Sequence, residues 1–370
     1  MRYARPAISV IMPVRDAAAT LAACLASALR QRMGDFELLA VDDGSADGSP
    51  ALLESAARAD PRVRVLRPGR VGLVAALNLG LAEARAPLVA RMDADDLMHP
   101  DRLGLQRAHM EAHPELALVA SRVALFPRAL VRGGYAEYAR WQNRVLTPAQ
   151  VSANIYVESP FAHPSVMLRR AAVAALGGYA DGPFPEDYEL WLRLHEAGMP
   201  MAKLPRVLLA WREGPARASR TDPRYAREAF DGLRAAFLAR DPRLRTGREL
   251  VYWGGGRPTR LRARRLIDQG FPPAAWVDVD PRKLGQTVWG APVRPRQWLG
   301  GGGPPPLLVG FRRGPGGGAG PAPRGGGGGD TGGRGGGRGG ARRGAPASGS
   351  AGGARAPSCW STSPATATTT

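Results

Sequence analysis

Short apolar runs alternate with amphipathic segments over the first third of the chain. The runs are apolar at nearly every position, whereas the segments between them repeat their apolar residues at helical spacing. Strands that lack an alternating polar face are buried on both sides, which is typical of a mainly parallel α/β sheet covered by helices. We expect strands within the ranges 8–14, 36–45, 63–68, 88–96 and 116–126, with helices between them.

The pattern continues less regularly beyond residue 126. Residues 127–160 are less regular, with Tyr135, Tyr138 and Trp141 among Arg and Gly, so the pattern assigns no helix or strand with defined bounds there. The periodicity then predicts a strand at 161–170, a helix at 184–198, a strand at 201–213 and a closing helix at 222–240. We therefore place a first domain at residues 1–241.

Two further segments follow this domain. A strand leads into a turn at Gly254 and Gly256, and a helix and a second strand come next, which outlines a partial Rossmann-like domain over residues 242–310. Residues 311–370 hold 21 Gly and no Leu, Ile, Val or Met, so this tail has no means to build a core and is expected to be disordered. A shifted reading frame in GC-rich coding near residue 311 would produce such a composition, and a genuine basic tail is the alternative.

Composition excludes several classes of partner and site. The net charge of +19 comes almost entirely from arginines spread along the whole chain, so the sequence predicts no nucleic-acid-binding block. Cys24 and Cys359 are too few for a disulfide framework or a zinc cluster and fit a reducing compartment. No apolar stretch approaches the roughly 18 to 20 residues that span a bilayer. We expect a cytoplasmic protein, with peripheral membrane association left open.

Carboxylates gather where predicted strands end. The segment RMDADD places Asp93 and Asp95 two residues apart, and a strand period of two would direct both side chains to one face. Mg²⁺ or Mn²⁺ binds such a pair when substrate phosphates and water complete its shell. The segment VDDGSADGS ends an earlier strand with Asp42 and Asp43. Each motif taken alone is equally compatible with an acidic turn that caps the next helix.

A third acidic pair, Glu186 and Asp187, opens the helix predicted at 184–198. Acidic residues in a first helical turn often serve only the cap and the helix dipole. A catalytic base must be ionised, however, and we expect the positive helix N-terminus to favour that form. His163 precedes Pro164, and we interpret it as a structural histidine held by backbone partners.

Taken in order, these pieces resemble the inverting glycosyltransferases of family 2, which have the A-type nucleotide-diphosphosugar transferase fold. The resemblance covers about residues 7 to 240 and rests on SVIMPVRD, VDDGSADGS, GLVAALNLGL, ARMDADDLMHPDRL, HPSVMLRR and FPEDYELWLRL. A second, shorter resemblance links VDVDPRKLGQTVWGAPV to the small nucleotide-sugar-binding Rossmann-like domain of bacterial sugar acyltransferases.

The family resemblance implies a metal-dependent, inverting transfer of a sugar from a nucleoside-diphosphate sugar, by family habit a UDP-sugar. The acceptor would be a hydroxyl of a glycan or lipid-linked molecule in surface polysaccharide synthesis. The implied roles are a nucleoside pocket at Pro13, Val14, Asp42 and Asp43, a metal site at Asp93 and Asp95, a catalytic base at Asp187 and an acceptor-orienting carboxylate at Glu186. Some relatives place a histidine ligand near the end of the domain, where this chain offers Arg212 and Arg217 to hold phosphate.

Two other functions remain open from the residues themselves. A nucleotidyltransferase shares the α/β nucleotide fold and acidic metal sites, but it usually has a Gly-rich loop after the first strand, and PVRDAAAT contains no Gly. A non-catalytic sugar-nucleotide-binding or assembly protein would retain Asp43 and Asp93 and have no need of Asp187. The sequence carries no signal for an oligomeric state.

Overall fold

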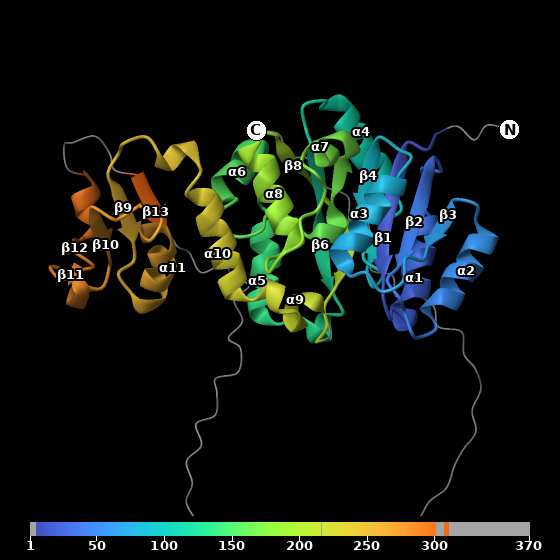
Figure 1. Ribbon diagram of the computed structural model, residues 1–370, viewed down its shortest axis with the longest axis horizontal. Coiled ribbons are helices and arrows are strands. Elements are labelled where there is room, and N and C mark those ends of the chain that lie inside the picture. Colours follow the sequence, from blue (N-terminus) through green and yellow to red (C-terminus); the bar gives the residue numbers. More distant parts are fainter. Residues whose placement is uncertain (1–4, 216, 301–306, 311–370) are drawn as a thin grey trace, which may run out of the picture. The chain divides into compact units, whose positions relative to one another are not determined.

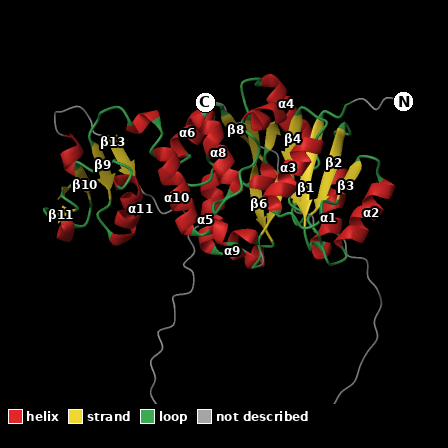
Figure 2. Cartoon of the chain, viewed as in Figure 1, coloured by secondary structure: helices red, strands yellow, loops and turns green. Residues whose placement is uncertain are grey.

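The computed structural model describes residues 5–215, 217–300 and 307–310, so the tail predicted at 311–370 lies outside the described residues. An eight-stranded sheet of mixed, mostly parallel strands dominates the fold, and helices cover both of its faces (Figure 1). A second sheet of five strands is formed by residues from Leu250 onward (Figure 2). This architecture confirms the predicted α/β class.

The larger sheet has the strand order β3-β2-β1-β4-β7-β6-β8-β5. The first four of these are mutually parallel, β7 is antiparallel to both of its neighbours, and the short β5 is antiparallel to β8. The carboxyl ends of β1, β2 and β4 therefore share one edge, where ligands bind in such sheets. The bounds are β1 (Ile8–Val14), β2 (Phe36–Asp42), β3 (Val63–Leu66), β4 (Leu88–Arg91), β5 (Leu97–Met98), β6 (Leu118–Phe126), β7 (Met167–Arg169) and β8 (Met201–Arg212).

Both faces of the larger sheet are buried, as the continuous apolar runs predict. In β1, Met12 belongs to the apolar cluster beneath α1, α2 and α4, whereas Ile11 belongs to the cluster beneath α3 and α8. Helix α3 lies so close to β1 that a Cβ atom on Gly80 would stand 2.5 Å from Cγ2 of Ile11. Glycine at this position therefore sets the spacing between helix and sheet.

Three segments between residues 127 and 240 differ from the sequence prediction. The expected strand at 161–170 is reduced to β7, since Pro164 cannot donate to a strand ladder and His163–Ser165 forms a 3₁₀ turn. Residues 127–160 contain two helices, and the closing helix begins only at Arg227. The bounds are α1 (Ala18–Leu29), α2 (Ser49–Ala59), α3 (Leu73–Glu83), α4 (Arg102–Ala112), α5 (Gly133–Gln142), α6 (Pro148–Asn154), α7 (Arg170–Ala175), α8 (Glu186–Glu196), α9 (Ala218–Thr221), α10 (Arg227–Leu238) and α11 (Arg257–Ile267).

The smaller sheet holds more than the two strands expected from the sequence. Its order is β11-β12-β10-β9-β13, with all neighbours parallel except the edge strand β11. Pro258 lies in the first turn of α11, where a missing N–H costs nothing, so it does not break the helix. The bounds are β9 (Leu250–Trp253), β10 (Ala275–Val277), β11 (Thr287–Val288), β12 (Ala291–Arg294) and β13 (Leu307–Gly310).

None of the helices in the described part of the chain combines the length and the apolar character that crossing a bilayer requires.

Candidate active site

An acidic turn follows β4 at the edge where β1, β2 and β4 end. After Arg91 the chain folds back, and the N–H of Asp96 donates to the carbonyl of Asp93 at 3.3 Å. Carboxylate oxygens of Asp93, Asp95 and Asp96 lie within 4.8 Å of one another. Asp93 and Asp95 do come together, but through a turn, so the predicted period-two strand geometry is wrong. The prediction also omitted Asp96, although the DADD motif contains it.

The three carboxylates of this turn are crowded and incompletely bonded. Burial, followed by the negative charge of Asp93, raises the pKa of Asp95 to about 6. Burial and the charges of both neighbours raise the pKa of Asp96 well above its ordinary value. Its buried Oδ2 atom accepts no hydrogen bond from any residue that the structure describes. Hard carboxylate oxygens in such a cluster match the ligand preference of Mg²⁺ or Mn²⁺.

Contacts with neighbouring elements fix the backbone of the turn. The backbone N–H of Arg212 in β8 donates to Asp96 Oδ1 at 2.6 Å, and its side-chain Nε donates to the carbonyl of Asp95, also at 2.6 Å. The Cys24 thiol in α1 contacts the Asp93 carbonyl at 3.2 Å. Arg212 is thus occupied with the protein itself, and its predicted role in holding phosphate would require it to leave these contacts.

Arg217 is the cation better placed to meet an anionic substrate at this turn. Its guanidinium carbon lies 4.4 Å from the ring centroid of Trp211 and 5.1 Å from that of Tyr135, and Glu213 pairs with it at 3.3 Å. Its positive charge opposes the upward effect that burial and Asp93 have on the pKa of Asp95. The aromatic rings and Glu213 therefore hold Arg217 within electrostatic reach of the acidic turn.

Glu186 and Asp187 form the first turn of α8, and their environments differ. The hydroxyl of Tyr225 donates to Glu186 Oε2 at 2.7 Å, and Nδ1 of His163 lies 3.6 Å from Oε1. Burial alone would raise the pKa of Glu186, but these two partners outweigh it and lower the pKa. Burial and the charge of Glu186 raise the pKa of Asp187 to about 8. The backbone N–H groups at the helix N-terminus do lower the pKa of Asp187, in the expected direction, but burial and the charge of Glu186 outweigh them.

His163 is held by side chains and not, as expected, by backbone partners. Its Nε2 atom lies 2.9 Å from the Tyr179 hydroxyl, and its Nδ1 faces Glu186. Burial, followed by the charge of Arg91, lowers the pKa of His163. A neutral imidazole in this place bridges Tyr179 and Glu186 and fixes the direction of the carboxylate.

Arg91 links the acidic turn to the start of α8. Its guanidinium is buried, contacts Asp93 through Nη1, and leaves Nε without a hydrogen-bond partner among the described residues. Its positive charge acts against the burial and the Glu186 charge that raise the pKa of Asp187. The charge of Arg91 therefore acts both on the acidic turn and on the first turn of α8. The sequence prediction missed Arg91, whose signal was its place two residues before Asp93.

The residues predicted for the nucleoside lie at the same sheet edge. Pro13 and Val14 end β1, and Val14 is in register with Asp42 at the end of β2. Asp42 accepts from the N–H of Ser45 at 3.0 Å, which makes it a turn residue as its motif allows. Asp43 Oδ1 accepts two bonds of 2.7 Å from the N–H groups of Val71 and Gly72. Asp43 thereby ties the loop before α3 to the end of β2.

A second Asp-x-Asp pattern follows β10 in the smaller sheet. Asp278 Oδ2 accepts from the N–H of Gly255 at 2.7 Å and from the Lys283 ammonium at 3.0 Å. Burial would raise the pKa of Asp278, but these bonds and the N–H of Asp280 lower it. The carboxylate is therefore fully used in joining the glycine turn to the end of β10.

Comparison with known proteins identifies relatives of the first 200 residues or so. Residues 9–177 match the family model described as "Glycosyl transferase family 2". The amylovoran biosynthesis glycosyltransferase AmsE of Erwinia amylovora is 34% identical over 192 residues, which cover 52% of this chain and 70% of the relative. The O-antigen biosynthesis glycosyltransferase WbnJ of Escherichia coli is 29% identical over 188 residues, which cover 50% of this chain and 71% of the relative.

The fold is also similar to that of a solved structure. S. aureus TarS 1–349, in complex with UDP-GlcNAc, superposes with a TM-score of 0.51 at 17% identity and covers 71% of each chain. At this identity the similarity extends to the fold alone.

Proposed function

Because this chain belongs to glycosyltransferase family 2, we propose that it transfers a sugar from a nucleoside-diphosphate sugar to an acceptor hydroxyl in the synthesis of a surface polysaccharide. AmsE and WbnJ, by their names, act in amylovoran and O-antigen biosynthesis, which supports the polysaccharide assignment. The single observation that carries the chemistry is the cluster of Asp93, Asp95 and Asp96, in which Asp93 contacts the buried Arg91, whose charge also acts on Asp187.

A divalent cation fits the acidic turn. Three carboxylates within 4.8 Å, two of them with raised pKa values, and the unbonded Oδ2 of Asp96 among the described residues are features that a cation would relieve. Asp93 and Asp95, with Asp96, would hold Mg²⁺ or Mn²⁺. When bound, such an ion neutralises charge on the leaving nucleoside diphosphate.

Asp187 is the residue that we assign as catalytic base. In the proposed step, the acceptor oxygen attacks the anomeric carbon, the bond from that carbon to the diphosphate oxygen breaks, and the hydroxyl proton moves to Asp187. One in-line displacement of this kind inverts the anomeric configuration. A carboxylate with a raised pKa is a stronger base than an ordinary aspartate, which suits the role once it is ionised.

The remaining roles are binding of the acceptor, of the diphosphate and of the nucleoside. We assign to Glu186, which Tyr225 and His163 hold, the task of orienting the acceptor, and to Arg217 the binding of the diphosphate. Pro13, Val14, Asp42 and Asp43 lie at the ends of β1 and β2, and we assign the nucleoside to this region. UDP is the nucleotide we expect; TarS, which shares the fold, binds UDP-GlcNAc.

The residues beyond this domain have a separate proposal. We take residues 1–241 as the transferase domain and 242–310 as a small Rossmann-like domain that binds a nucleotide sugar. The parallel order β12-β10-β9-β13 supports such a domain. The bonds that Asp278 already makes to Gly255 and Lys283 would have to be shared with any ligand at that turn.

A donor hydrolysis screen tests the proposed function. UDP-, GDP- and dTDP-sugars are incubated with the full chain in the presence and absence of Mn²⁺, and release of the nucleoside diphosphate is measured. We expect one class of donor to be hydrolysed slowly, only with metal, and the released sugar to show inverted configuration by NMR. Tight donor binding with no hydrolysis and no transfer to any acceptor would instead favour the non-catalytic binding protein.

A further inference from the structure

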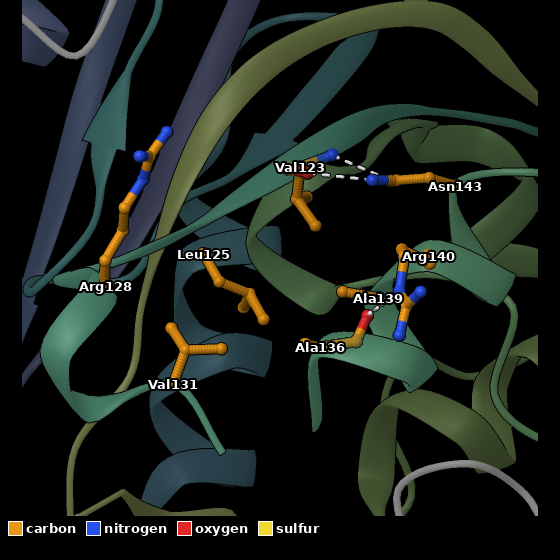
Figure 3. Close-up of a pocket in the computed structure, with 8 residues that line it drawn as sticks. All are labelled: Val123, Leu125, Arg128, Val131, Ala136, Ala139, Arg140 and Asn143. Carbon is orange, nitrogen blue, oxygen red and sulfur yellow. Dashed lines mark hydrogen bonds between the residues drawn. The ribbon is translucent and has the colours of Figure 1, made fainter. Parts of the chain in front are cut away.

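An open surface pocket of about 410 Å³ lies between β6 and α5, outside the acidic site, and is called the cavity below. Val123 and Leu125 of β6 form one wall, and Ala136 and Ala139 of α5 form the other. Figure 3 shows Leu125 and Val131 pointing into the space between the strand and the helix. Asn143 closes one end through two bonds of 2.9 Å to the backbone of Val123. The lining is therefore mainly apolar, and the amide of Asn143 is already hydrogen-bonded to the backbone.

Arginines surround this cavity without counter-ions. Four exposed arginines lie within 17 residues of sequence, accompanied by one acidic residue, Glu137, and none of the four forms an ion pair with a described residue; they are Arg128, Arg132, Arg140 and Arg144. Arg128 and Arg140 belong to the cavity lining itself and stand at opposite sides of it in Figure 3. Leu130, next to them, is 47% exposed. Other exposed arginines of the larger domain also form no ion pair with a described residue, for example Arg30, Arg85 and Arg206, but they are scattered along the sequence. The four arginines named here are set apart because they fall within one short segment.

Helix α5 connects the cavity to the candidate active site. Tyr135 and Tyr138 lie on its other side, where Tyr135 packs on Trp211 with ring centroids 5.4 Å apart and lies beneath Arg217. Ala136, Ala139 and Arg140 face the cavity. A ligand in the cavity would therefore sit one helix away from the acidic turn.

We propose that this cavity and its arginines bind an anionic phospholipid of a membrane surface. An acyl chain would enter the apolar space between Leu125, Val131 and Ala139, and phosphate groups of the membrane surface would meet Arg128 on one side and Arg140 on the other. The charge of the rim selects an anion, and the apolar lining selects a molecule with a hydrocarbon segment. Each arginine near an anionic membrane surface contributes about 1 kcal/mol, or about a fivefold change in partitioning. The binding does not depend on sugar transfer.

The charge of the site is tested by vesicle sedimentation with the full chain. Vesicles of phosphatidylglycerol and phosphatidylcholine are compared with vesicles of phosphatidylcholine alone. We expect binding only to the anionic vesicles, and the double variant Arg128→Gln, Arg140→Gln to lower the partition coefficient about 10- to 30-fold. The matched control Arg30→Gln, Arg85→Gln removes two exposed arginines from outside the segment and should change it far less. If both double variants lowered the partition coefficient equally, the proposed lipid site would be wrong, and only the total positive charge would matter.

The cavity itself is tested with a soluble probe, dodecyl phosphate below its critical micelle concentration. Calorimetry should detect its binding, with inorganic phosphate and dodecyl maltoside as much weaker ligands. Ala136→Leu narrows the cavity and adds apolar surface, so it should weaken dodecyl phosphate binding if the chain enters the cavity. Unchanged or stronger binding in a variant that melts like the wild type would overturn the proposal. The charge variant should keep wild-type donor hydrolysis, so loss of lipid binding alone is distinguishable from failure of the proposed function.

Discussion

The chain contains two Asp-x-Asp patterns after buried strands, and the structure gives them opposite properties. After β4, Asp95 and Asp96 are crowded, and burial raises the pKa of both. After β10, Asp278 is bonded to Gly255, Asp280 and Lys283, and its pKa is lowered. The same local pattern thus produces two different turns. After β4 only Asp93 forms an ion pair, with Arg91, while Asp95 and Asp96 form none with a described residue; after β10 both carboxylates are paired. Unsatisfied carboxylates, more than the motif, mark the site of chemistry.

The strongest test of this contrast is at the proposed base. Asp187→Asn should lower transfer by about 10²- to 10⁴-fold, the usual range for a general base, while donor affinity stays near the wild-type value. Steady-state kinetics with the true acceptor, together with donor titration, measure the two effects. Asp280→Asn, in the completed turn, serves as the matched control and should transfer at the wild-type rate. Near-wild-type turnover of Asp187→Asn would leave Asp187 as a helix cap only.

The pH profile of the reaction follows from the raised pKa of Asp187. The base form accumulates as pH rises toward about 8, so kcat/KM should increase about tenfold per pH unit below that value. Between pH 6 and 8 the expected change in kcat/KM is about fiftyfold, since half of the base is ionised at pH 8. An ordinary aspartate would be ionised throughout this range, and a flat profile would therefore contradict the assignment. The measurement is made at saturating Mn²⁺ with protein stability checked at each pH.

Metal dependence sharpens the comparison between the two turns. Asp95→Ala should lower donor affinity in the presence of Mn²⁺ at least about tenfold and abolish the difference made by the metal, because one cation ligand is lost. In Asp278→Ala, the difference in donor affinity with and without Mn²⁺ should stay as in the wild type. Calorimetric titration of the donor with and without Mn²⁺ measures it. A metal-dependent affinity that survives in Asp95→Ala would show that the acidic turn does not hold the cation.

The two turns should also differ in the sign of their effect on stability. The folded-state pKa of Asp95 is raised, so ionising it costs stability as pH rises from about 4 to 6, and Asp95→Asn should stabilise the metal-free protein at pH 7 by about 1 to 2 kcal/mol. The folded-state pKa of Asp278 is lowered, so its contribution is present at pH 7 and lost in acid. Asp278→Asn should therefore destabilise by about 1 to 2 kcal/mol. Thermal melts at pH 7 and pH 4 measure the stability change in each variant. If both variants were stabilised at pH 7, or both destabilised, the proposed difference between the two turns would be wrong.

Much of the fold could be predicted from the chain because its signals are local. The apolar runs around Val10, Leu39 and Val89 identify strands that are indeed buried on both faces. The insertion of β7 antiparallel between β4 and β6 could not be predicted, since it pairs segments about 50 to 80 residues apart and depends on how the whole sheet closes. Nor did a period-two argument anticipate that the chain would already turn at Asp93.

For the candidate site too, the sequence predicted what local motifs determine and missed what depends on distant contacts. The positions of Asp93, Asp95, Glu186 and Asp187 were predicted from motifs. In the structure Asp93 contacts the buried Arg91, and the charge of Arg91 interacts with Glu186 and Asp187. Their protonation could not be predicted, because it depends on burial and on partners far along the chain. Tyr225 reaches Glu186 across 39 residues of sequence, and His163 reaches it from another segment again. Their roles in catalysis stay predictions until the variants are measured.

Cys24 gives the active-site edge an intrinsic reporter. Its side chain is fully buried, with Sγ against the Asp93 carbonyl and 3.5 Å from the Met12 sulfur, and burial raises its pKa well above the ordinary value. A thiol reagent can therefore react only in molecules where α1 has locally separated from β1 and the acidic turn. In a Cys359→Ser variant, the rate at which the reagent labels Cys24 reports how often this local opening occurs. Bound donor and metal should lower the labelling rate of Cys24, and the more they stabilise the closed state of this sheet edge, the larger the decrease should be.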